Sequence, residues 1–265
     1  MPIRILCCAL RSFLLVLVGS TLLFSQNQPP PSDPQALSLV SQSMAALTGG
    51  RNISDVTLSG TANWSNGTNN EAASATLMAK GTGESRFDMT LNAGPRSEVR
   101  NDGSTTYQGE LLASDGSVNP WAAQNCLVNA GWFFPQLSVL GITGDATLIF
   151  LYVGQETRNG ATVQHIQSYR YSSNNTATTQ RLSTMDIYLD AASFLPAAFL
   201  FNVYPNDDST QNIPVEVDFS TYQSLNGIQV PYRIQRYVAG NLGFDFSVTG
   251  AQFNSGLQDS LFAIQ

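Results

Sequence analysis

The sequence predicts a mainly β (α+β) protein, built on a strongly curved antiparallel sheet that forms an incomplete barrel. Apolar and polar side chains alternate in many segments; in residues 185–190, for example, Asp186, Tyr188 and Asp190 alternate with apolar side chains. Alternation with a period of two indicates strands with one apolar and one solvated face. Short Gly- and Asn-rich turns between the segments favour antiparallel hairpins over parallel units, which need long crossovers.

The first 25 residues have the layout of a secretory signal peptide. Arg4 and Arg11 precede an apolar run over residues 13–24, which is short for a membrane-spanning helix and is followed by polar, Pro-rich sequence. We therefore expect residues 1–25 to be removed on export, with an uncleaved membrane anchor as the alternative. Residues 26–33 form a Pro-rich leader, and residues 34–265 are predicted to be a single domain in the periplasm or outside the cell.

Composition limits the partners of the domain and the means of stabilising it. The chain has 12 basic and 19 acidic residues and a net charge of −7, and Lys80 is its one lysine. Because no basic stripe is present, the sequence predicts no nucleic-acid partner. The exported chain would retain a single cysteine, Cys126, so an internal disulfide is excluded. We expect Cys126 to be buried as a small apolar side chain.

The predicted helix covers residues 34–48. Ser32 or Asp33 can cap its N-terminus, Pro34 suits its first position, and Gly49-Gly50 ends it. Its apolar stripe is predicted to be Leu37, Val40, Met44 and Leu47. Short helices of this kind are expected to cover the concave face of the sheet. The strands expected in the first half of the chain cover residues 53–64, 72–80, 85–92, 97–101 and 105–111.

Residues 119–140 differ from the rest of the chain because they are strongly apolar and aromatic and include no charged residue. We expect two short helices here, the second opening at Pro135. Such a segment either plugs the core or forms a lid over a cavity. The strands expected after it cover residues 147–157, 161–171, 183–190, 197–204, 213–222, 228–239 and 242–253, with a polar loop at 172–179.

Catalytic patterns are not apparent in the sequence. His165 is the one histidine and lies within a predicted strand, so we interpret it as structural. Asp207-Asp208 falls in a predicted turn and lacks the ligand spacing of a calcium loop. The carboxylates that alternate with apolar strand residues, interpreted as solvated, are Asp186, Asp190, Glu216 and Asp218. The sequence therefore predicts a protein that is not an enzyme and that uses no cofactor and no metal.

Three motifs follow one another in the last third of the chain. The first is LDAASFLP at residues 189–196. The second combines VDFSTY at residues 217–222 with NGIQVP at residues 226–231. The third is NSGLQDSLF at residues 254–262. Each motif alone mainly encodes turns, but their order and spacing together are more specific.

These motifs resemble signatures of the periplasmic outer-membrane lipoprotein carriers, the LolA/LolB-like superfamily: L-D-x-x-[ST]-x-x-P, F-x-x-Y-x-x-x-N-G-I-x-x-P and N-x-x-[IL]-x-x-x-x-F. The resemblance implies a half barrel whose apolar concave side accepts acyl chains. An apolar trough suits a lipid tail because each buried CH₂ contributes about 0.8 kcal/mol. The candidate ligand-binding residues are Trp132, Phe133, Phe134, Leu137 and Leu140 from residues 119–140, and Phe199, Phe201, Phe219, Phe244 and Phe246 from the strands.

The leading hypothesis is an exported, non-enzymatic protein that binds lipid or lipoprotein acyl chains, with lipoprotein sorting to the outer membrane as the role that the resemblance implies. The main alternative is an envelope protein-interaction or stress-sensing module with a filled interior and a protein partner. A hydrolase acting on envelope polymer is the third hypothesis. An apolar cavity of several hundred Å³ would favour binding, whereas a packed interior would favour interaction.

Overall fold

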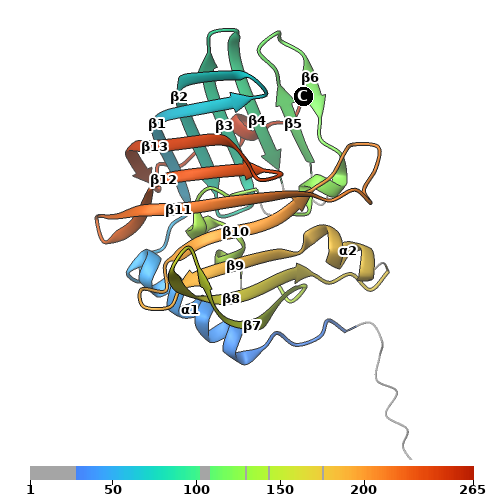
Figure 1. The fold of residues 1–265 in the computed structure, drawn as a ribbon, viewed down its shortest axis with the longest axis vertical. Coiled ribbons are helices and arrows are strands. Elements are labelled where there is room, and N and C mark those ends of the chain that lie inside the picture. Colours follow the sequence, from blue (N-terminus) through green and yellow to red (C-terminus); the bar gives the residue numbers. More distant parts are fainter. Residues whose placement is uncertain (1–27, 102–107, 129, 143, 175) are drawn as a thin grey trace, which may run out of the picture.

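The structure is a computed structural model that describes residues 28–101, 108–128, 130–142, 144–174 and 176–265. The predicted signal peptide and the start of the leader lie outside the described residues, as do residues 105–107 of the fifth predicted strand. The described chain forms a 13-stranded sheet with antiparallel pairing, open between its edge strands β6 and β7. The strand direction turns through the sheet (Figure 1), and the predicted curved, incomplete barrel is confirmed.

The sheet consists of two meanders that meet in its middle. The first contains β1 (Asp55–Asn66), β2 (Asn69–Lys80), β3 (Glu84–Leu91), β4 (Gly94–Asn101), β5 (Gln108–Leu112) and β6 (Val118–Pro120). The second contains β7 (Leu148–Arg158), β8 (Ala161–Arg170), β9 (Met185–Asp190), β10 (Pro196–Val203), β11 (Ile213–Leu225), β12 (Ile228–Val238) and β13 (Asn241–Phe253). The pairing of β1 with β13 joins the two meanders, so strands distant in sequence share the centre.

Hairpin turns explain why the predicted strand positions agree with the structure. Asn226 and Gly227, between β11 and β12, have φ angles of 52° and 78°. Positive φ at both central residues matches the right-handed twist of the strands that a tight turn joins. A side chain at Gly227 would also collide with the guanidinium of Arg51. Strand β6 was not predicted; its last two residues begin the stretch 119–140, in which two short helices were expected.

Helix α1 (Pro34–Thr48) has the predicted bounds. Asp33 accepts a hydrogen bond of 2.7 Å from the backbone N–H of Gln35, and Gly49 ends the helix in the left-handed region. The predicted stripe is wrong in part, because Leu37 is 38% exposed. The buried face is Ala36, Leu39, Val40, Ser43, Leu47 and Thr48. Small side chains on this face allow the helix to lie close to β7 and β12, which it contacts.

The polar loop predicted for residues 172–179 is wrong in part: residues 172–174 are a loop, but helix α2 (Thr176–Ser183) takes up residues 176–179. Its composition is unfavourable for a helix, so contacts with the rest of the protein must stabilise it. The hydroxyl of Ser183 accepts a hydrogen bond from the backbone of Arg170, at the end of β8. Arg181 donates to the carbonyl of Ser209 and lies over the ring of Tyr204. Local sequence patterns do not contain this information.

The apolar segment, which we define as residues 130–142, covers the concave face of the sheet. Three 3₁₀ turns replace the two predicted short helices between β6 and β7: η1 (Ala123–Cys126), η2 (Pro135–Leu137) and η3 (Val139–Gly141). Pro135 opens η2, as predicted. Every residue from 130 to 140 is buried. The ring of Trp132 meets Phe244 of β13 at a centroid distance of 6.4 Å.

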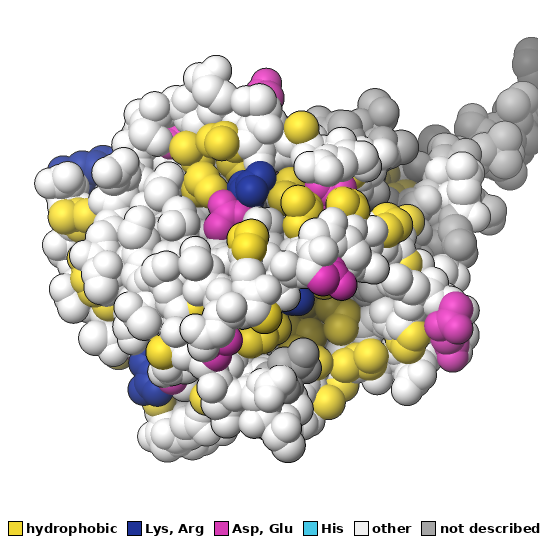
Figure 2. Space-filling view, turned by 90° about the horizontal axis from the view of Figure 1, so that it is seen from above, with side chains coloured by type: hydrophobic (Ala, Val, Ile, Leu, Met, Phe, Trp, Pro, Cys, Tyr) yellow, Lys and Arg dark blue, Asp and Glu magenta, His cyan; other side chains and the backbone are white. Residues whose placement is uncertain are grey.

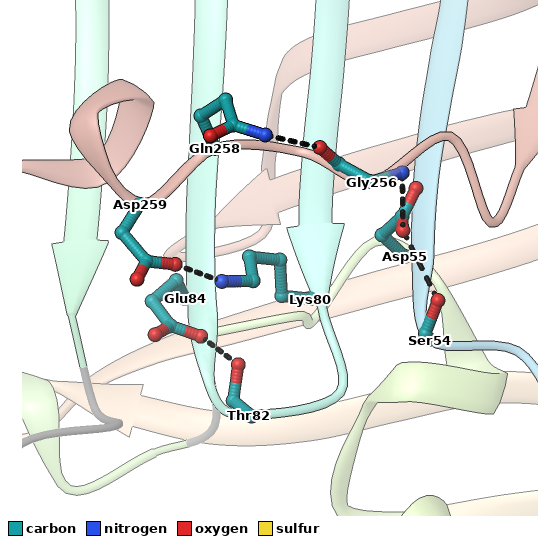
Figure 3. A network of polar contacts seen from close by, with 8 residues as sticks. All are labelled: Ser54, Asp55, Lys80, Thr82, Glu84, Gly256, Gln258 and Asp259. Atoms are coloured by element: carbon teal, nitrogen blue, oxygen red, sulfur yellow. Dashed lines mark hydrogen bonds and ion pairs between the residues drawn. The ribbon is translucent and has the colours of Figure 1, made fainter.

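The C-terminal segment crosses the opposite, outer face of the sheet. Figure 3 shows it passing β1 and β2, where Asp55 accepts a hydrogen bond of 3.1 Å from Gly256 and Lys80 pairs with Asp259. The 3₁₀ turn η4 (Asp259–Phe262) then buries the ring of Phe262 completely. The third motif of the sequence therefore fixes the end of the chain onto the first meander.

Candidate functional site

The ten predicted ligand-binding residues lie together in the interior. Nine of them are at most 8% exposed, and Phe201 is partly buried against the same cluster. Phe199 and Phe219 pack edge to face at 4.9 Å, and Phe244 and Phe246 stack at 5.8 Å. Side chains of the chain itself therefore fill the centre of the concave face. The apolar segment therefore plugs the core in this part of the sheet, rather than forming a lid over a cavity.

A cavity of about 320 Å³ remains at one end of the concave face. We call it the end pocket; it lies between β4–β6 on one side and β10–β12 on the other. Two of the ten predicted residues, Trp132 and Phe201, line it. The other apolar side chains of its lining are Leu111, Pro120, Trp121, Val203, Tyr204, Val215 and Val238. Figure 2 shows one face of the molecule, on which hydrophobic side chains line a hollow and surround a few charged ones.

Asn125 fixes one wall of the end pocket. Its side-chain amide donates to the carbonyl of Tyr204 at 2.8 Å, and its side-chain oxygen accepts from the Tyr204 N–H at 2.7 Å. Two reciprocal bonds of this kind substitute for a strand pairing. Gln124 adds a bond of 3.0 Å to the carbonyl of Pro205. The segment after β6 is thereby tied to the segment after β10, and the pocket between them has a defined width.

Glu98 and Arg236, which both line the end pocket, form a buried ion cluster with Arg96. Glu98 of β4 accepts hydrogen bonds of 3.2 and 3.3 Å from the two terminal nitrogens of Arg236 on β12. Arg96 lies 3.7 Å from the same carboxylate. Burial alone would raise the pKa of Glu98, but the charge and hydrogen bonds of Arg236, with Arg96 and Arg100, outweigh it and leave the pKa below its ordinary value. Glu98 is therefore ionised at neutral pH.

Each tryptophan of the chain lies against an arginine of this region. Arg96 lies over Trp64 at 4.7 Å, Arg236 over Trp132 at 4.8 Å, and Arg100 over Trp121 at 5.4 Å. Guanidinium groups gain about 0.5–2 kcal/mol from such stacking, more when desolvated. Stacking also fixes the orientation of each guanidinium plane.

Sequence reasoning missed the charged residues of the end pocket. Arg96, Glu98 and Arg100 alternate along one strand, so the sequence does indicate that they share a face. Charged side chains at that period are normally interpreted as a solvated face. Here they lie on the concave side, because the cross-strand partner of Glu98 is the core residue Phe87. Only the partner strands reveal which face is enclosed.

A second cavity, of about 560 Å³, lies between α1, the apolar segment and the β2–β3 turn. Leu137 lines it, and Leu140 borders a neighbouring groove along α1. Much of its lining is polar, including the ion pair between Arg170 and Asp145 at 3.0 Å. The buried side-chain oxygen of Gln136 has no hydrogen-bond partner among the described residues. Because more polar side chains line this cavity than line the end pocket, it suits water better than an acyl chain.

The one histidine and the one cysteine of the exported chain lie outside the end pocket. His165 lies 2.9 Å from Asp186 and stacks on Tyr188 at 4.5 Å, on the side of the sheet away from the end pocket. The predicted burial of Cys126 is confirmed, since its side chain is fully enclosed. Among the described residues, the His, Cys, Asp and Glu side chains form no group of three that could hold a metal ion. No helix in the described part of the chain is long and apolar enough to cross a membrane.

Asp218, predicted to be solvated, is partly buried on this outer face. Burial first, and then the neighbouring charge of Glu216, raise its pKa to about 6. Arg158 pairs with Glu216 and lowers the pKa of Asp218 only in part. This carboxylate is therefore protonated at a higher pH than the sequence pattern indicates.

No protein-family model and no curated protein matches the chain. Three solved structures with similar folds are an outer-membrane lipoprotein-sorting protein domain from Vibrio parahaemolyticus, a DUF1329 family protein from Desulfovibrio piger and a LolA superfamily protein from Nitrosomonas europaea. Their identities are 13%, 12% and 11%, and their TM-scores 0.54, 0.53 and 0.53. The matches cover 86%, 88% and 86% of this chain and 96%, 98% and 97% of the others. The chain therefore has a LolA/LolB-like fold, as the resemblance of its C-terminal motifs implied.

Proposed function

We propose that the chain is an exported, non-enzymatic binding protein for lipid or lipoprotein acyl chains, and that the end pocket holds the ligand. The observation that carries this proposal is an apolar cavity of about 320 Å³ at the open end of a fold whose centre is filled. Binding pockets in proteins span about 300–1,000 Å³. The end pocket is at the lower limit, so it suits one acyl chain or the end of one.

The proposal modifies the set of ligand-binding residues. Trp132 and Phe201 line the end pocket and stay in the proposed site, together with the wall residues Val203, Val215 and Val238. The remaining eight predicted residues support the pocket from the core, as their burial indicates. Leu137 lines the second cavity, and Leu140 borders the groove along α1. The proposal does not require a ligand in either place.

The fold is consistent with this role, and two of the similar proteins are named for lipoprotein sorting or the LolA superfamily. Identities of 11–13% do not transfer a function, so the proposal depends on the pocket. We include export to the periplasm or cell exterior and a single domain over residues 34–265 in the proposal. A non-enzymatic role agrees with the position of His165 on the outer face, bound to Asp186.

A chain-length series tests the proposal on the exported protein. We expect single-chain amphiphiles with one headgroup to bind more tightly by about fourfold per added CH₂, since each buried CH₂ contributes about 0.8 kcal/mol, until the pocket is full. Isothermal titration below the critical micelle concentration measures this. The variant Phe201→Glu should abolish binding, and Val153→Glu, at a position 55% exposed, should not. Affinity that is absent, or independent of chain length, would overturn the proposal.

The envelope interaction module remains a second candidate, favoured by the filled centre of the concave face. It predicts that purified protein carries no lipid and that amphiphiles leave its melting temperature unchanged. Mass spectrometry of the protein under native conditions distinguishes the two candidates, because a bound lipid adds a defined mass.

A further inference from the structure

The end pocket is positively charged inside a negatively charged protein. The chain carries a net charge of −7, yet Arg236 lines the pocket beside Glu98, and both of them belong to a cluster that has more arginines than carboxylates among the described residues. Arg96 adds a further positive charge 3.7 Å from that carboxylate. A concave site with walls of low dielectric concentrates the electrostatic field and attracts ligands of the opposite sign.

Glu98 does not fully compensate its two closest arginines. Its bonds to Arg236, at 3.2 and 3.3 Å, are longer than the 2.7–2.9 Å typical of charge-assisted hydrogen bonds. Burial lowers the pKa of Arg96; the charge of Glu98 opposes that shift, and the charge of Arg236 adds to it. The Nε–H of Arg96 is also buried without an acceptor among the described residues. A second anion beside Arg236 would reduce the repulsion between the two guanidinium groups.

The tryptophans orient the two arginines toward such an anion. Trp64 and Trp132 cover the flat faces of Arg96 and Arg236. The N–H groups of a guanidinium lie in its plane, so a covered face leaves the edge for hydrogen bonding. Planar, oriented donors suit carboxylate and phosphate groups, which accept two bonds from one arginine.

We infer that the end pocket selects amphiphiles with an anionic headgroup, a carboxylate or a phosphate, which Arg236 binds alongside or in place of Glu98, while the charge of Arg96 adds to the attraction. This inference deepens the proposed function and depends on it. The acyl chain lies against the apolar wall of β10–β12 while the headgroup reaches the ion cluster. The ligand class is therefore an anionic single-chain lipid or the anionic end of a larger one.

Three probes of the unmodified protein separate the inference from the proposed function. They are dodecyl phosphate, the neutral amphiphile dodecyl maltoside below its micelle concentration, and inorganic phosphate, each measured by isothermal titration. We expect dodecyl phosphate to bind at least tenfold more tightly than both others, with an affinity that falls as salt is raised. Equal affinity of the two amphiphiles would overturn the inference and leave the proposed function intact. Binding of inorganic phosphate as tight as that of dodecyl phosphate, or no binding of either amphiphile, would overturn both.

Two variants test the role of the cluster, and a third is a matched control. Glu98→Gln removes the competing carboxylate, and we expect it to tighten dodecyl phosphate binding about tenfold without changing dodecyl maltoside. The double variant Glu98→Gln/Arg236→Gln keeps the formal charge of the pocket but should lose at least tenfold for dodecyl phosphate. Arg233→Gln removes an arginine from the outer face of the same strand and should change neither.

Circular dichroism and a thermal melt confirm that each variant is folded. If Glu98→Gln does not fold, the double variant carries the test, because it removes one arginine together with the carboxylate and leaves only Arg96 without its partner. Unchanged affinity for dodecyl phosphate in the folded double variant would contradict the inference.

Discussion

Arg233 and Arg236 lie three positions apart on β12 and therefore face opposite sides of the sheet. Arg236 is 13% exposed, and its partner Glu98, from a strand of the other meander, is 8% exposed. Arg233 is 48% exposed and pairs at 2.7 Å with Asp245 on the adjacent strand. Both partners of the first pair are desolvated beside a pocket, whereas in the second pair Asp245 is 14% exposed and the arginine is about half in solvent.

This comparison teaches that the curvature of the sheet decides what a charged residue does. On the outer face, an ion pair contributes about 0–1 kcal/mol because water screens it. On the concave face, each charge has lost its water, and removal of one partner leaves the other uncompensated. Substitutions on the two faces should therefore differ in their cost to stability.

Truncation of the apolar segment should give the largest difference between the faces. Phe134 is fully buried and its ring lies 6.0 Å from that of Phe253, so we expect Phe134→Ala to lower the free energy of unfolding by about 3–5 kcal/mol. The matched change Val153→Ala, at an exposed strand position, should stay within about 0.5 kcal/mol. Urea unfolding followed by tryptophan fluorescence measures both. A cost below about 1 kcal/mol for Phe134→Ala would show that the segment is a loosely held lid.

The two ion pairs should differ by several fold in stability. We expect Glu98→Gln to cost about 2–4 kcal/mol, since it leaves Arg236 and Arg96 buried without a carboxylate. Asp245→Asn should cost at most about 1 kcal/mol. Glu98→Gln/Arg236→Gln should cost less than the sum of its two single changes, as urea unfolding of the double-mutant cycle would measure. Equal costs for the two carboxylates would remove the distinction between the faces.

The C-terminal segment covers part of the outer face, and Asp55 holds it. Burial alone would raise the pKa of Asp55, but hydrogen bonds from Ser255, Gly256 and Ser54 outweigh it and lower the pKa from its ordinary value of 3.8. The stabilisation is present above pH 3.8 and is lost as the pH falls through the lower folded-state pKa. We expect Asp55→Ala to cost about 1–2 kcal/mol and to speed hydrogen exchange of residues 254–262.

A nearby carboxylate provides the control for Asp55. Glu84 accepts a hydrogen bond from Thr82 within the β2–β3 turn and, unlike Asp55, accepts none from the C-terminal segment among the described residues. Glu84→Ala should therefore leave hydrogen exchange of residues 254–262 unchanged. If both variants release this segment equally, the hydrogen bonds of Asp55 are not what holds it.

Asp218 should give the smallest effect, and its sign is opposite. Its folded-state pKa of about 6 exceeds the ordinary value of 3.8. The favourable contribution of its proton is therefore present below pH 3.8 and lost as the pH rises through about 6. We expect Asp218→Asn to be more stable than the unmodified protein by about 1 kcal/mol at pH 8 and to have no advantage at pH 4. This figure is smaller than the full pKa shift would give, because water screens the partly exposed carboxylate. Urea unfolding at both pH values measures this, and a destabilised variant at pH 8 would contradict it.

The regular part of the fold could be predicted because its signals are local. Alternation along β9, β11 and β13 and the Asn226-Gly227 turn determine strands and hairpins from neighbouring residues alone. Helix α1 likewise carries its own cap, Pro34 and terminal glycines. Helix α2 could not be predicted, since contacts of Ser183 and Arg181 with distant segments stabilise it.

The candidate site was predicted only in part for the same reason. Sequence identified the apolar segment and the aromatic strand residues, because apolar character is a property of each residue. It did not separate Trp132 and Phe201, which line the end pocket, from the eight that do not. It also missed the ion cluster, because Glu98 and Arg236 are 138 residues apart in the chain.

By itself, the sequence determined which segments are strands, where they turn, and that an apolar surface must be covered. The tertiary structure decided what covers it: the apolar segment fills the centre, and the pairing of β1 with β13 brings β4 and β12 onto one curved surface. The physical reason is that alternation specifies two faces of each strand, but only the closure of distant strands determines which face loses its water.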